Sequence, residues 1–251
     1  MKFNFHSHTS RCMHAVGSDE DYVKAAIEAG FDEIGFSDHT PWPFESGYVS
    51  YMRMRKEELA SYAESVFELR EKYRGKIKIH LGLECEYFKD CLPWLCAECE
   101  KNGIEYLLLG HHFSPDEETG IYNGSIKTPE QLERYKNDVL EALDSGLFLY
   151  LAHPDIFMRR YGDFDSHCEK ISREIIEKAI ETDTPLEYNL LGFSHCVADK
   201  MKEGYPHSAF WKIAGEAGAK AVIGIDAHDP KAYLDAERFE KAKETLASLG
   251  V

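Results

Sequence analysis

The chain has 251 residues, 43% of them hydrophobic, and a formal net charge of −16 at pH 7. A chain of this length can form one large domain such as an α/β barrel, and its acidic excess opposes the basic surface that nucleic-acid binding requires. No apolar run approaches the roughly 18 to 20 residues of a membrane span, and the N-terminal segment lacks the apolar core of a signal peptide. We therefore expect a cytoplasmic protein with no nucleic-acid or membrane partner, and reduced thiols at its seven cysteines.

Seven apolar segments rich in β-forming residues recur along the chain, with helical patterns between them. The predicted strands are 2–8, 33–39, 77–84, 106–111, 147–153, 185–189 and 221–226. The predicted helices are 19–29, 56–73, 129–145, 167–182, 208–217 and 236–249. Alternation of strands and helices, with strands that are apolar throughout, predicts a parallel sheet. Seven such units favour closure into a barrel, within a single domain that covers residues 1–251.

Helix-end signals support these boundaries. Ser18 is a typical N-cap for the helix that begins at residue 19, and Gly30 follows its end. Thr128 precedes Pro129, and proline favours the first position of a helix.

Cys91, Cys96 and Cys99 have a spacing similar to that of plant-type iron–sulfur ligands. Their apolar neighbours instead indicate an ordinary amphipathic helix, and an obvious fourth ligand is missing. We prefer the helix.

His6 and His8 stand at the end of the first predicted strand. Side chains alternate along a strand, so the two imidazoles point to the same face and can bind one divalent ion. The motif is weak by itself, because 12 histidines make such pairs common by chance.

Ligand-type residues also stand at or just after the ends of the other predicted strands. The full set is His6, His8, His14, His39, Glu84, His111, His153, Asp226 and His228. Active sites of parallel barrels lie at the C-terminal ends of the strands. Buried structural histidines or helix caps explain any single member, but not the whole set, so the sequence predicts a metal centre.

These motifs resemble the PHP (polymerase and histidinol phosphatase) superfamily. The matching pieces are His6-Ser7-His8 with His14, Ser37-Asp38-His39, Gly82-Leu83-Glu84, His111, His153-Pro154-Asp155 and Asp226-Ala227-His228. The resemblance implies a distorted (β/α)7 barrel of the PHP type, an α/β fold. It implies a first metal site at His6, His8, Glu84 and Asp226, a second at Glu84, His111 and His153, and a third at His14, His39 and His228. Two or three Zn²⁺, Mn²⁺ or Fe²⁺ ions suit these ligands.

Further pieces resemble the histidinol-phosphatase branch: Thr40-Pro41, Met52-Arg53-Met54-Arg55, Glu86-Tyr87 and Tyr205-Pro206. The resemblance implies a metal-dependent phosphomonoesterase of histidine biosynthesis that hydrolyses L-histidinol phosphate. We expect hydroxide between the first two metals to attack phosphorus, with Glu84, Asp226 and His153 as catalytic ligands. A covalent route through Cys12 is the less favoured alternative.

Phosphate binding is expected to need an arginine. The resemblance favours Arg160 for this role, and Arg53 is a second candidate. Branch members commonly carry an arginine after the sixth strand, where this chain reads 189–195 without one. We expect Ser194 or His195 to replace it, and this departure puts the substrate in doubt.

Other small phosphorylated metabolites or nucleotides therefore remain alternative substrates, and a non-catalytic metal-binding regulatory module is the alternative of another class. Asp38 and Asp155 adjoin predicted ligands, so each is expected to orient an imidazole, receive a proton or cap a helix. We expect His112 to point away from the metal centre. The aromatic loop 41–55 is expected to form a lid.

Overall fold

The computed structural model describes residues 1–193 and 204–251. The chain forms two compact units, one of residues 1–108 with 225–236 and the other of residues 109–224 with 237–251. Ser194 and His195, predicted to replace the missing arginine, lie outside the described residues.

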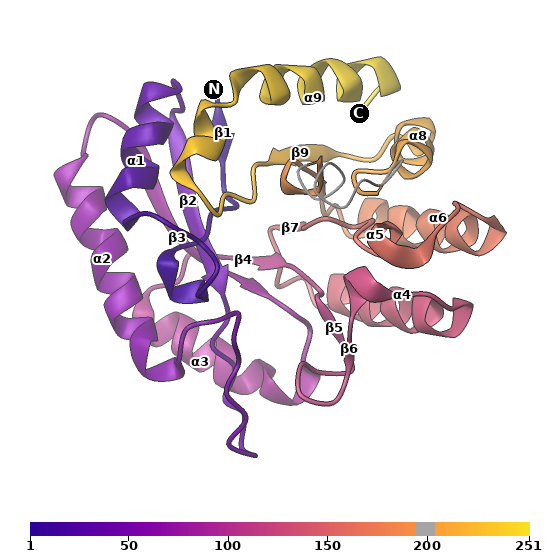
Figure 1. The fold of residues 1–251 in the computed structure, drawn as a ribbon, viewed down its shortest axis with the longest axis horizontal. Helices are drawn as coiled ribbons and strands as arrows, with labels where there is room; N and C mark the ends of the chain where they lie inside the picture. The colour runs from indigo at the N-terminus through magenta and orange to yellow at the C-terminus, as the bar shows by residue number, and fades with distance from the viewer. Residues whose placement is uncertain (194–203) are drawn as a thin grey trace. The chain divides into compact units, whose positions relative to one another are not determined.

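The first unit is built on strands that pair in chain order (Figure 1). They are β1 (Phe3–Asn4), β2 (Glu33–His39), β3 (Lys78–Cys85) and β4 (Tyr106–Leu109). β1 pairs with β2 and β2 with β3, both in parallel. All seven residues of β2 are buried, as expected of a strand covered on both faces.

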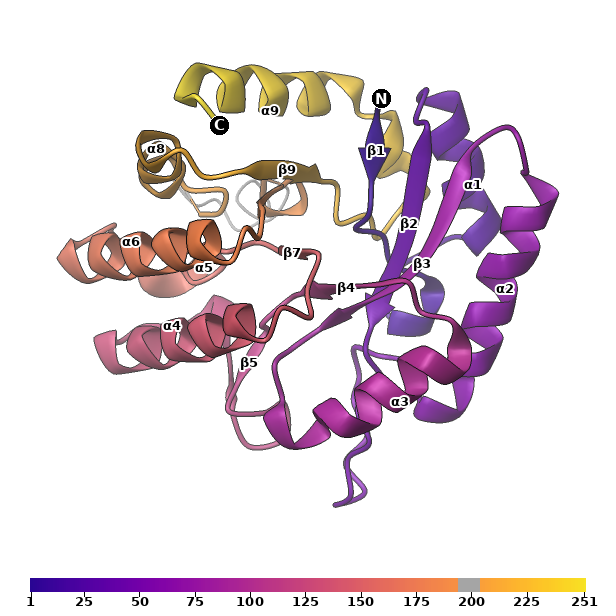
Figure 2. The same ribbon diagram turned by 180° about the vertical axis from the view of Figure 1, so that it is seen from behind.

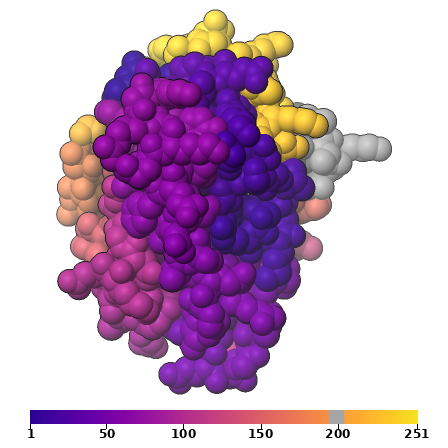
Figure 3. All heavy atoms as spheres, turned by 90° about the vertical axis from the view of Figure 1, so that its left-hand side faces the viewer, coloured from indigo at the N-terminus to yellow at the C-terminus, as the bar shows by residue number. Residues whose placement is uncertain are grey.

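Helices α1 (Asp19–Glu28) and α2 (Leu59–Lys72) lie outside β2 and β3, and they form the face seen in Figure 3. Their apolar stripes are buried, with Tyr22 and Val23 on α1 and Tyr62 and Val66 on α2. The remaining helices of this unit are α3 (Leu92–Asn102) and short 3-10 turns at Ser10–Cys12, Lys56–Glu58, Lys89–Cys91 and Pro230–Leu234.

Tyr106 ties the strands of the first unit together. Its hydroxyl donates hydrogen bonds to the carbonyls of Phe5 (2.8 Å) and Phe36 (3.0 Å). Its ring passes over Gly35 and Gly82, where an added Cβ would lie 2.2 Å and 2.4 Å from its atoms. Glycine is therefore required at both positions for the tyrosine to cross β2 and β3.

The second unit contains the parallel strands β7 (Tyr150–Leu151), β8 (Leu186–Asn189) and β9 (Ala221–Gly224). A short antiparallel hairpin pairs β5 (Phe113–Ser114) with β6 (Ile121–Tyr122). Leu109, the last residue of β4, already belongs to the second unit, and its carbonyl accepts a hydrogen bond from the amide of Ala152 (3.0 Å).

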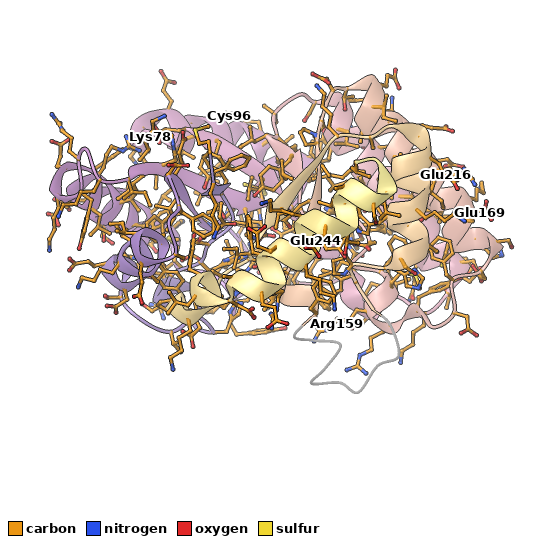
Figure 4. All side chains as sticks on the ribbon, turned by 90° about the horizontal axis from the view of Figure 1, so that it is seen from above. Lys78, Cys96, Arg159, Glu169, Glu216 and Glu244 are labelled. Atoms are coloured by element: carbon orange, nitrogen blue, oxygen red, sulfur yellow. The ribbon has the colours of Figure 1, made fainter. Side chains whose placement is uncertain are left out.

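The helices of the second unit lie in a row beside its strands, and α6 packs against both α4 and α8 (Figures 1 and 2). Among the described residues of this unit they are α4 (Pro129–Asp144), α5 (Met158–Tyr161), α6 (Ser166–Glu181), α8 (Ser208–Ala217), α9 (Ala236–Leu249) and a 3-10 turn at Asn123–Ser125. Glu169 of α6 and Glu216 of α8 point outward into solvent (Figure 4).

The predicted strands near residues 2–8 and 147–153 were too long. Only Phe3–Asn4 and Tyr150–Leu151 form ladders. The reason at β1 is the side chain of Asn4, which donates to the carbonyl of His6 (3.0 Å) and accepts from the amide of Ile225 (2.9 Å). This amide side chain takes over main-chain hydrogen bonds, so the chain beyond β1 leaves the regular ladder.

The order of the strands and their alternation with helices are those of the distorted (β/α)7 barrel, so the predicted fold class is confirmed. Cys91 is the N-cap of α3, and Cys96 and Cys99 lie on that helix, as the preferred prediction required. Among residues 1–193 and 204–251, no helix is both long and apolar enough to cross a membrane.

Candidate metal centre

The ends of β2 and β3 place His39 and Glu84 side by side. The parallel register pairs them directly, and the amide of Thr40 donates to the carbonyl of Glu84 (2.9 Å). The Nδ1 atom of His39 lies 3.0 Å from Oε2 of Glu84. Both side chains are buried.

His6 and His8 are aligned with Asp226 and His228 by a short parallel bridge between Ser7 and Ala227. The amide of His8 donates to the carbonyl of Ala227 (2.9 Å), and the amide of Ala227 donates to the carbonyl of His6 (3.2 Å). This bridge joins two segments separated by more than 200 residues of sequence, and both belong to the first unit.

Four predicted ligands of the first metal site converge. The Nε2 atom of His6 lies 3.4 Å from both Oε2 of Glu84 and Oδ1 of Asp226. The Nε2 atom of His8 lies 3.4 Å and 3.1 Å from the same oxygens. Ligands about 2.1 Å from one ion are about 3.0 Å apart at a right angle and about 3.4 Å apart at the tetrahedral angle. The observed separations therefore fit a single divalent ion held by two imidazoles and two carboxylates.

The carboxylates around His8 favour a positive charge at this place. Burial lowers the pKa of His8, but the interactions with Asp226, Asp38 and Glu84 outweigh it and raise the pKa to about 9. Burial likewise opposes ionisation of Asp226, yet His6, His8 and His228 hold its pKa well below the usual value. A buried cluster with this charge pattern suits a cation.

Asp38 lies beside these predicted ligands and is hydrogen-bonded to the residues next to them. Its Oδ2 accepts hydrogen bonds from the amide (3.2 Å) and the hydroxyl of Thr9, and its Oδ1 accepts from the amide of His39 (2.9 Å). Oδ1 also lies 3.6 Å from Nδ1 of His8, the ring nitrogen on the side away from Glu84. A carboxylate behind a histidine ligand is a common way to fix its ring.

The predicted third set also assembles within the first unit. The Nε2 atoms of His14 and His228 are 2.9 Å apart, and their rings stack with centroids separated by 4.6 Å. His39 stacks with His14 at 5.5 Å. Burial lowers the pKa of His14 and lowers that of His228 to about 3, so both favour the neutral form that binds metals.

Cys12 is unsuited to the covalent alternative. Burial raises the pKa of its thiol to about 12, with a further contribution from Asp38. The thiolate is the nucleophilic form, so this environment suppresses nucleophilic attack.

In the second unit, His153 follows β7 in a left-handed main-chain conformation with φ 31°. Its ring is buried, and its centroid lies 4.9 Å from that of His112. Residues other than glycine seldom adopt positive φ, and Asp226 does so too, with φ 52°. Such strain is concentrated at functional sites, which agrees with both predicted ligands.

His111 and His112 have different surroundings. Nε2 of His111 lies 3.0 Å from the hydroxyl of Ser114 and 3.2 Å from Oδ2 of Asp138 on α4. His112 is the neighbour of His153. The role of His111 as a ligand stays a prediction, but these contacts favour His112. Two adjacent histidines in the sequence signal that either one can be the ligand. Because β4 ends at Leu109, the alternation of side chains along a strand does not determine which of the two rings points inward.

The two predicted phosphate-binding arginines differ in environment. Arg160 is exposed on the short helix α5. The neighbouring Arg159, labelled in Figure 4, is half-buried and donates a hydrogen bond to the hydroxyl of Tyr122 (3.3 Å). Tyr122 in turn stacks on His112, with ring centroids 6.3 Å apart.

Arg53 is only 2% exposed and binds Glu86. Its Nη2 lies 2.9 Å from Oε1 and its Nη1 3.2 Å from Oε2 of that carboxylate, and Nη1 also donates to the carbonyl of Thr40 (2.8 Å). The indole of Trp42 donates to the same Oε2 (2.7 Å). Phosphate binding by Arg53 stays a prediction, and a phosphate would compete with Glu86 for its guanidinium.

The aromatic loop encloses a cavity of about 300 Å³. Its wall includes Trp42, Phe44, Tyr48 and Met54, and the charged residues Arg55 and Lys56 also line it. The hydrogen bonds of Arg53 and Trp42 to Glu86 attach this loop two residues beyond Glu84. The expected function of the loop as a lid stays a prediction.

Comparison with known proteins agrees with the motifs. The PHP domain model matches residues 4–191. A Deinococcus radiodurans protein named "Probable histidinol-phosphatase" is 26% identical over 90% of this chain and 85% of its own length. A Schizosaccharomyces pombe protein of the same name is 26% identical over 94% of this chain and 86% of its own. The structure of Lactococcus lactis histidinol phosphate phosphatase, complexed with zinc, L-histidinol and phosphate, has a TM-score of 0.74 at 21% identity, covering 99% of this chain and 94% of that one.

Proposed function

This chain belongs to the PHP domain family, and on that premise we propose that it is a metal-dependent phosphomonoesterase that hydrolyses L-histidinol phosphate to L-histidinol and phosphate. The observation that carries the proposal is the convergence of His6, His8, Glu84 and Asp226, with nitrogen–oxygen separations of 3.1–3.4 Å. The names of the matched relatives support the substrate. In this proposal residues 1–251 act as one PHP domain.

The ligand sets follow the clusters within each unit. His6, His8, Glu84 and Asp226 would hold one ion, and His14, His39 and His228 would hold another. In the second unit, His153 and His112 would be the metal ligands. Neutral imidazoles with few carboxylates suit Zn²⁺, Mn²⁺ or Fe²⁺, and we propose two or three such ions.

The bound ions would lower the pKa of water and offset the charge of the phosphoryl oxygens. Other residues of the chain would position the metal ligands. Asp38 orients His8, and the bridge between Ser7 and Ala227 fixes the spacing of the two ligand pairs. The buried carboxylates of Glu84 and Asp226 make the cluster favourable for cations.

Arg160 would bind the phosphate of the substrate from α5. A hydrogen bond between charged groups contributes about 1.5–3 kcal/mol, so Arg160→Ala should raise KM by roughly ten- to a hundredfold. kcat should change little if the arginine binds substrate and transition state equally. Steady-state kinetics of this variant and of Arg159→Ala would show which arginine has the role, and unchanged KM in Arg160→Ala would reject it.

A second candidate substrate is another small phosphate ester or a nucleotide. It is favoured by the sequence 189–195, which has no arginine after the sixth strand. Both candidates use the same metal centre, so they differ only in the leaving group.

The test is a panel of phosphate monoesters offered to protein loaded with Zn²⁺, Mn²⁺ or Fe²⁺. Histidinol phosphate should have the highest kcat/KM, well above p-nitrophenyl phosphate and nucleoside monophosphates. If a nucleotide or another ester ranks first, the substrate assignment is wrong. If no ester is hydrolysed by protein with full metal content, the proposed activity fails and the non-catalytic metal-binding module is favoured.

A further inference from the structure

Glu187 is a buried carboxylate with no role in the chemistry proposed so far. It lies on β8, and its side chain has no exposure to solvent. Its Oε2 accepts hydrogen bonds from the main-chain amide of His153 (3.0 Å) and from Nδ2 of Asn189 (2.9 Å). A buried carboxylate is costly unless it is well hydrogen-bonded, so a position of this kind indicates a specific task.

The neighbouring strand is shaped to admit this carboxylate. Gly224 on β9 pairs with Asn189 in the register, and a Cβ added to Gly224 would lie 1.7 Å from Oε1 of Glu187. No side chain fits at that distance. The absence of a side chain at residue 224 therefore creates the space that the Glu187 carboxylate occupies.

The amide that Glu187 binds belongs to a strained residue. His153 has φ 31°, and the chain turns there, since the amide of Ile156 donates to the carbonyl of His153 (3.0 Å). A left-handed conformation is unfavourable for a residue with a side chain. A charge-assisted hydrogen bond to the amide offsets this cost and holds the turn in place.

This turn determines where the imidazole points. The ring of His153 lies 4.9 Å from that of His112 and 6.2 Å from that of Tyr205. Relaxation of residue 153 to a negative φ would rotate the side chain away from both rings. The hydrogen bond from the His153 amide to Glu187 thus acts on the direction of His153 through its main chain.

We propose that Glu187 is a positioning residue for the metal ligand His153. Its carboxylate, admitted by Gly224, holds the main chain of His153 in the conformation that presents the imidazole to a divalent ion. The inference rests on the proposed function only in that His153 binds a metal. Mutation of a residue that orients a metal ligand typically lowers the metal affinity by about 10–100-fold.

The experiment compares Glu187→Leu, which removes the acceptor, with Glu187→Gln, whose amide oxygen can still accept from His153. Glu33→Leu is the control, because it also removes a largely buried carboxylate from a strand, where its partners are Lys78 and His80. Zn²⁺ binding to metal-free protein is measured by calorimetry, with His153→Ala as the reference for loss of the ligand. Hydrogen exchange of the His153 amide is followed by NMR in the metal-free state.

Glu187→Leu should weaken the same Zn²⁺ site as His153→Ala, by about 10–100-fold, and should speed exchange of the His153 amide. Glu187→Gln and Glu33→Leu should bind Zn²⁺ like the wild type. A purely structural role would lower Tm without a change in the affinity of the folded protein. If Glu187→Leu does not fold, Gly224→Ala takes its place, because the new methyl group displaces the carboxylate.

Three results would overturn the inference, and they can be told apart. If His153→Ala weakens a Zn²⁺ site but Glu187→Leu does not, the positioning role is wrong and the proposed metal centre survives. If His153→Ala leaves every Zn²⁺ site intact, His153 is no ligand, and both the inference and that part of the proposed function fail. Equal losses in Glu187→Leu and Glu187→Gln would also reject the hydrogen bond as the cause.

Discussion

The two units of this chain hold their histidines by different means. In the first unit His6 and His8 face carboxylates directly, and Glu84 and Asp226 lie 3.1–3.4 Å from their ring nitrogens. In the second unit the buried carboxylate Glu187 binds the main chain of His153 through its amide. The first arrangement suits a cation, whereas we propose that the second sets the direction of a single predicted ligand, His153.

The difference implies a division of tasks. The first unit contains imidazole and carboxylate ligands together, so it can hold a divalent ion with its own residues. In the second unit His112 and His153 are paired imidazoles, and the ring of His153 depends on a strained turn. We therefore expect changes in the first unit to affect metal content most strongly.

The largest effect is expected from Asp226→Asn. Asparagine tolerates the left-handed conformation at this position, so the fold should persist while a negative charge is lost. Metal content should fall, and kcat/KM should drop about a thousandfold, because an active-site ion contributes several kcal/mol. Metal analysis and kinetics provide the measurement.

Asp229→Ala is the matched control for this variant. Asp229 caps the 3-10 turn at Pro230–Leu234, where its side chain accepts from the amide of Lys231 (2.9 Å), and it should retain full metal content. Full metal content and full activity in Asp226→Asn would show that Asp226 is not a ligand, and that the first unit does not hold its ion through this carboxylate.

The next effect separates the two adjacent histidines of the second unit. His112→Ala should lose about one metal ion per chain and much of the activity, because its ring is next to His153. His111→Ala should keep its metal and lose about 1 kcal/mol of stability, since Ser114 and Asp138 lose a partner. Metal analysis and urea unfolding distinguish the two variants. If His111→Ala loses a metal ion and His112→Ala does not, His111 is the ligand.

A smaller effect on activity, but a clear one on stability, is expected from Arg53→Met. Removing one partner of a buried ion pair leaves Glu86 without its counter-charge and typically costs about 3–5 kcal/mol. Arg55→Met, an exposed change in the same loop, should cost far less. Unfolding free energies test this, and a raised KM with unchanged stability would instead support phosphate binding by Arg53.

The smallest effect concerns the surface of the first unit. Hydrogen bonds from Lys72 and Tyr73 lower the pKa of Glu20 from 4.5 to about 2. The folded state therefore favours the ionised form, and its stabilisation is full above pH 4.5 and is lost as the pH falls towards 2. The stability difference between metal-free wild type and Glu20→Gln should shrink over that range in urea titrations. A constant difference would show that the pairing does not depend on ionisation.

Much of this arrangement was predictable from sequence. The alternation of apolar and helical segments predicted a parallel α/β barrel, and the ligand-type residues at strand ends predicted a metal centre. The grouping of His6, His8, Glu84 and Asp226 as one site was implied by the resemblance to the PHP superfamily. At His111 and His112 the alternation of side chains along a strand does not apply. Adjacent residues on a strand point to opposite faces, but the strand ends at Leu109, and the side chains beyond it are directed by Ser114 and Asp138.

The sequence by itself determined which elements form and which chemical groups stand at their ends, because periodicity and residue type are local properties. Tertiary structure alone decided which groups meet. The bridge between Ser7 and Ala227 aligns two distant ligand pairs, and the space above Gly224 admits Glu187. Both depend on the close approach of segments far apart in the chain, and a distance between such segments is set by packing and not by any local pattern.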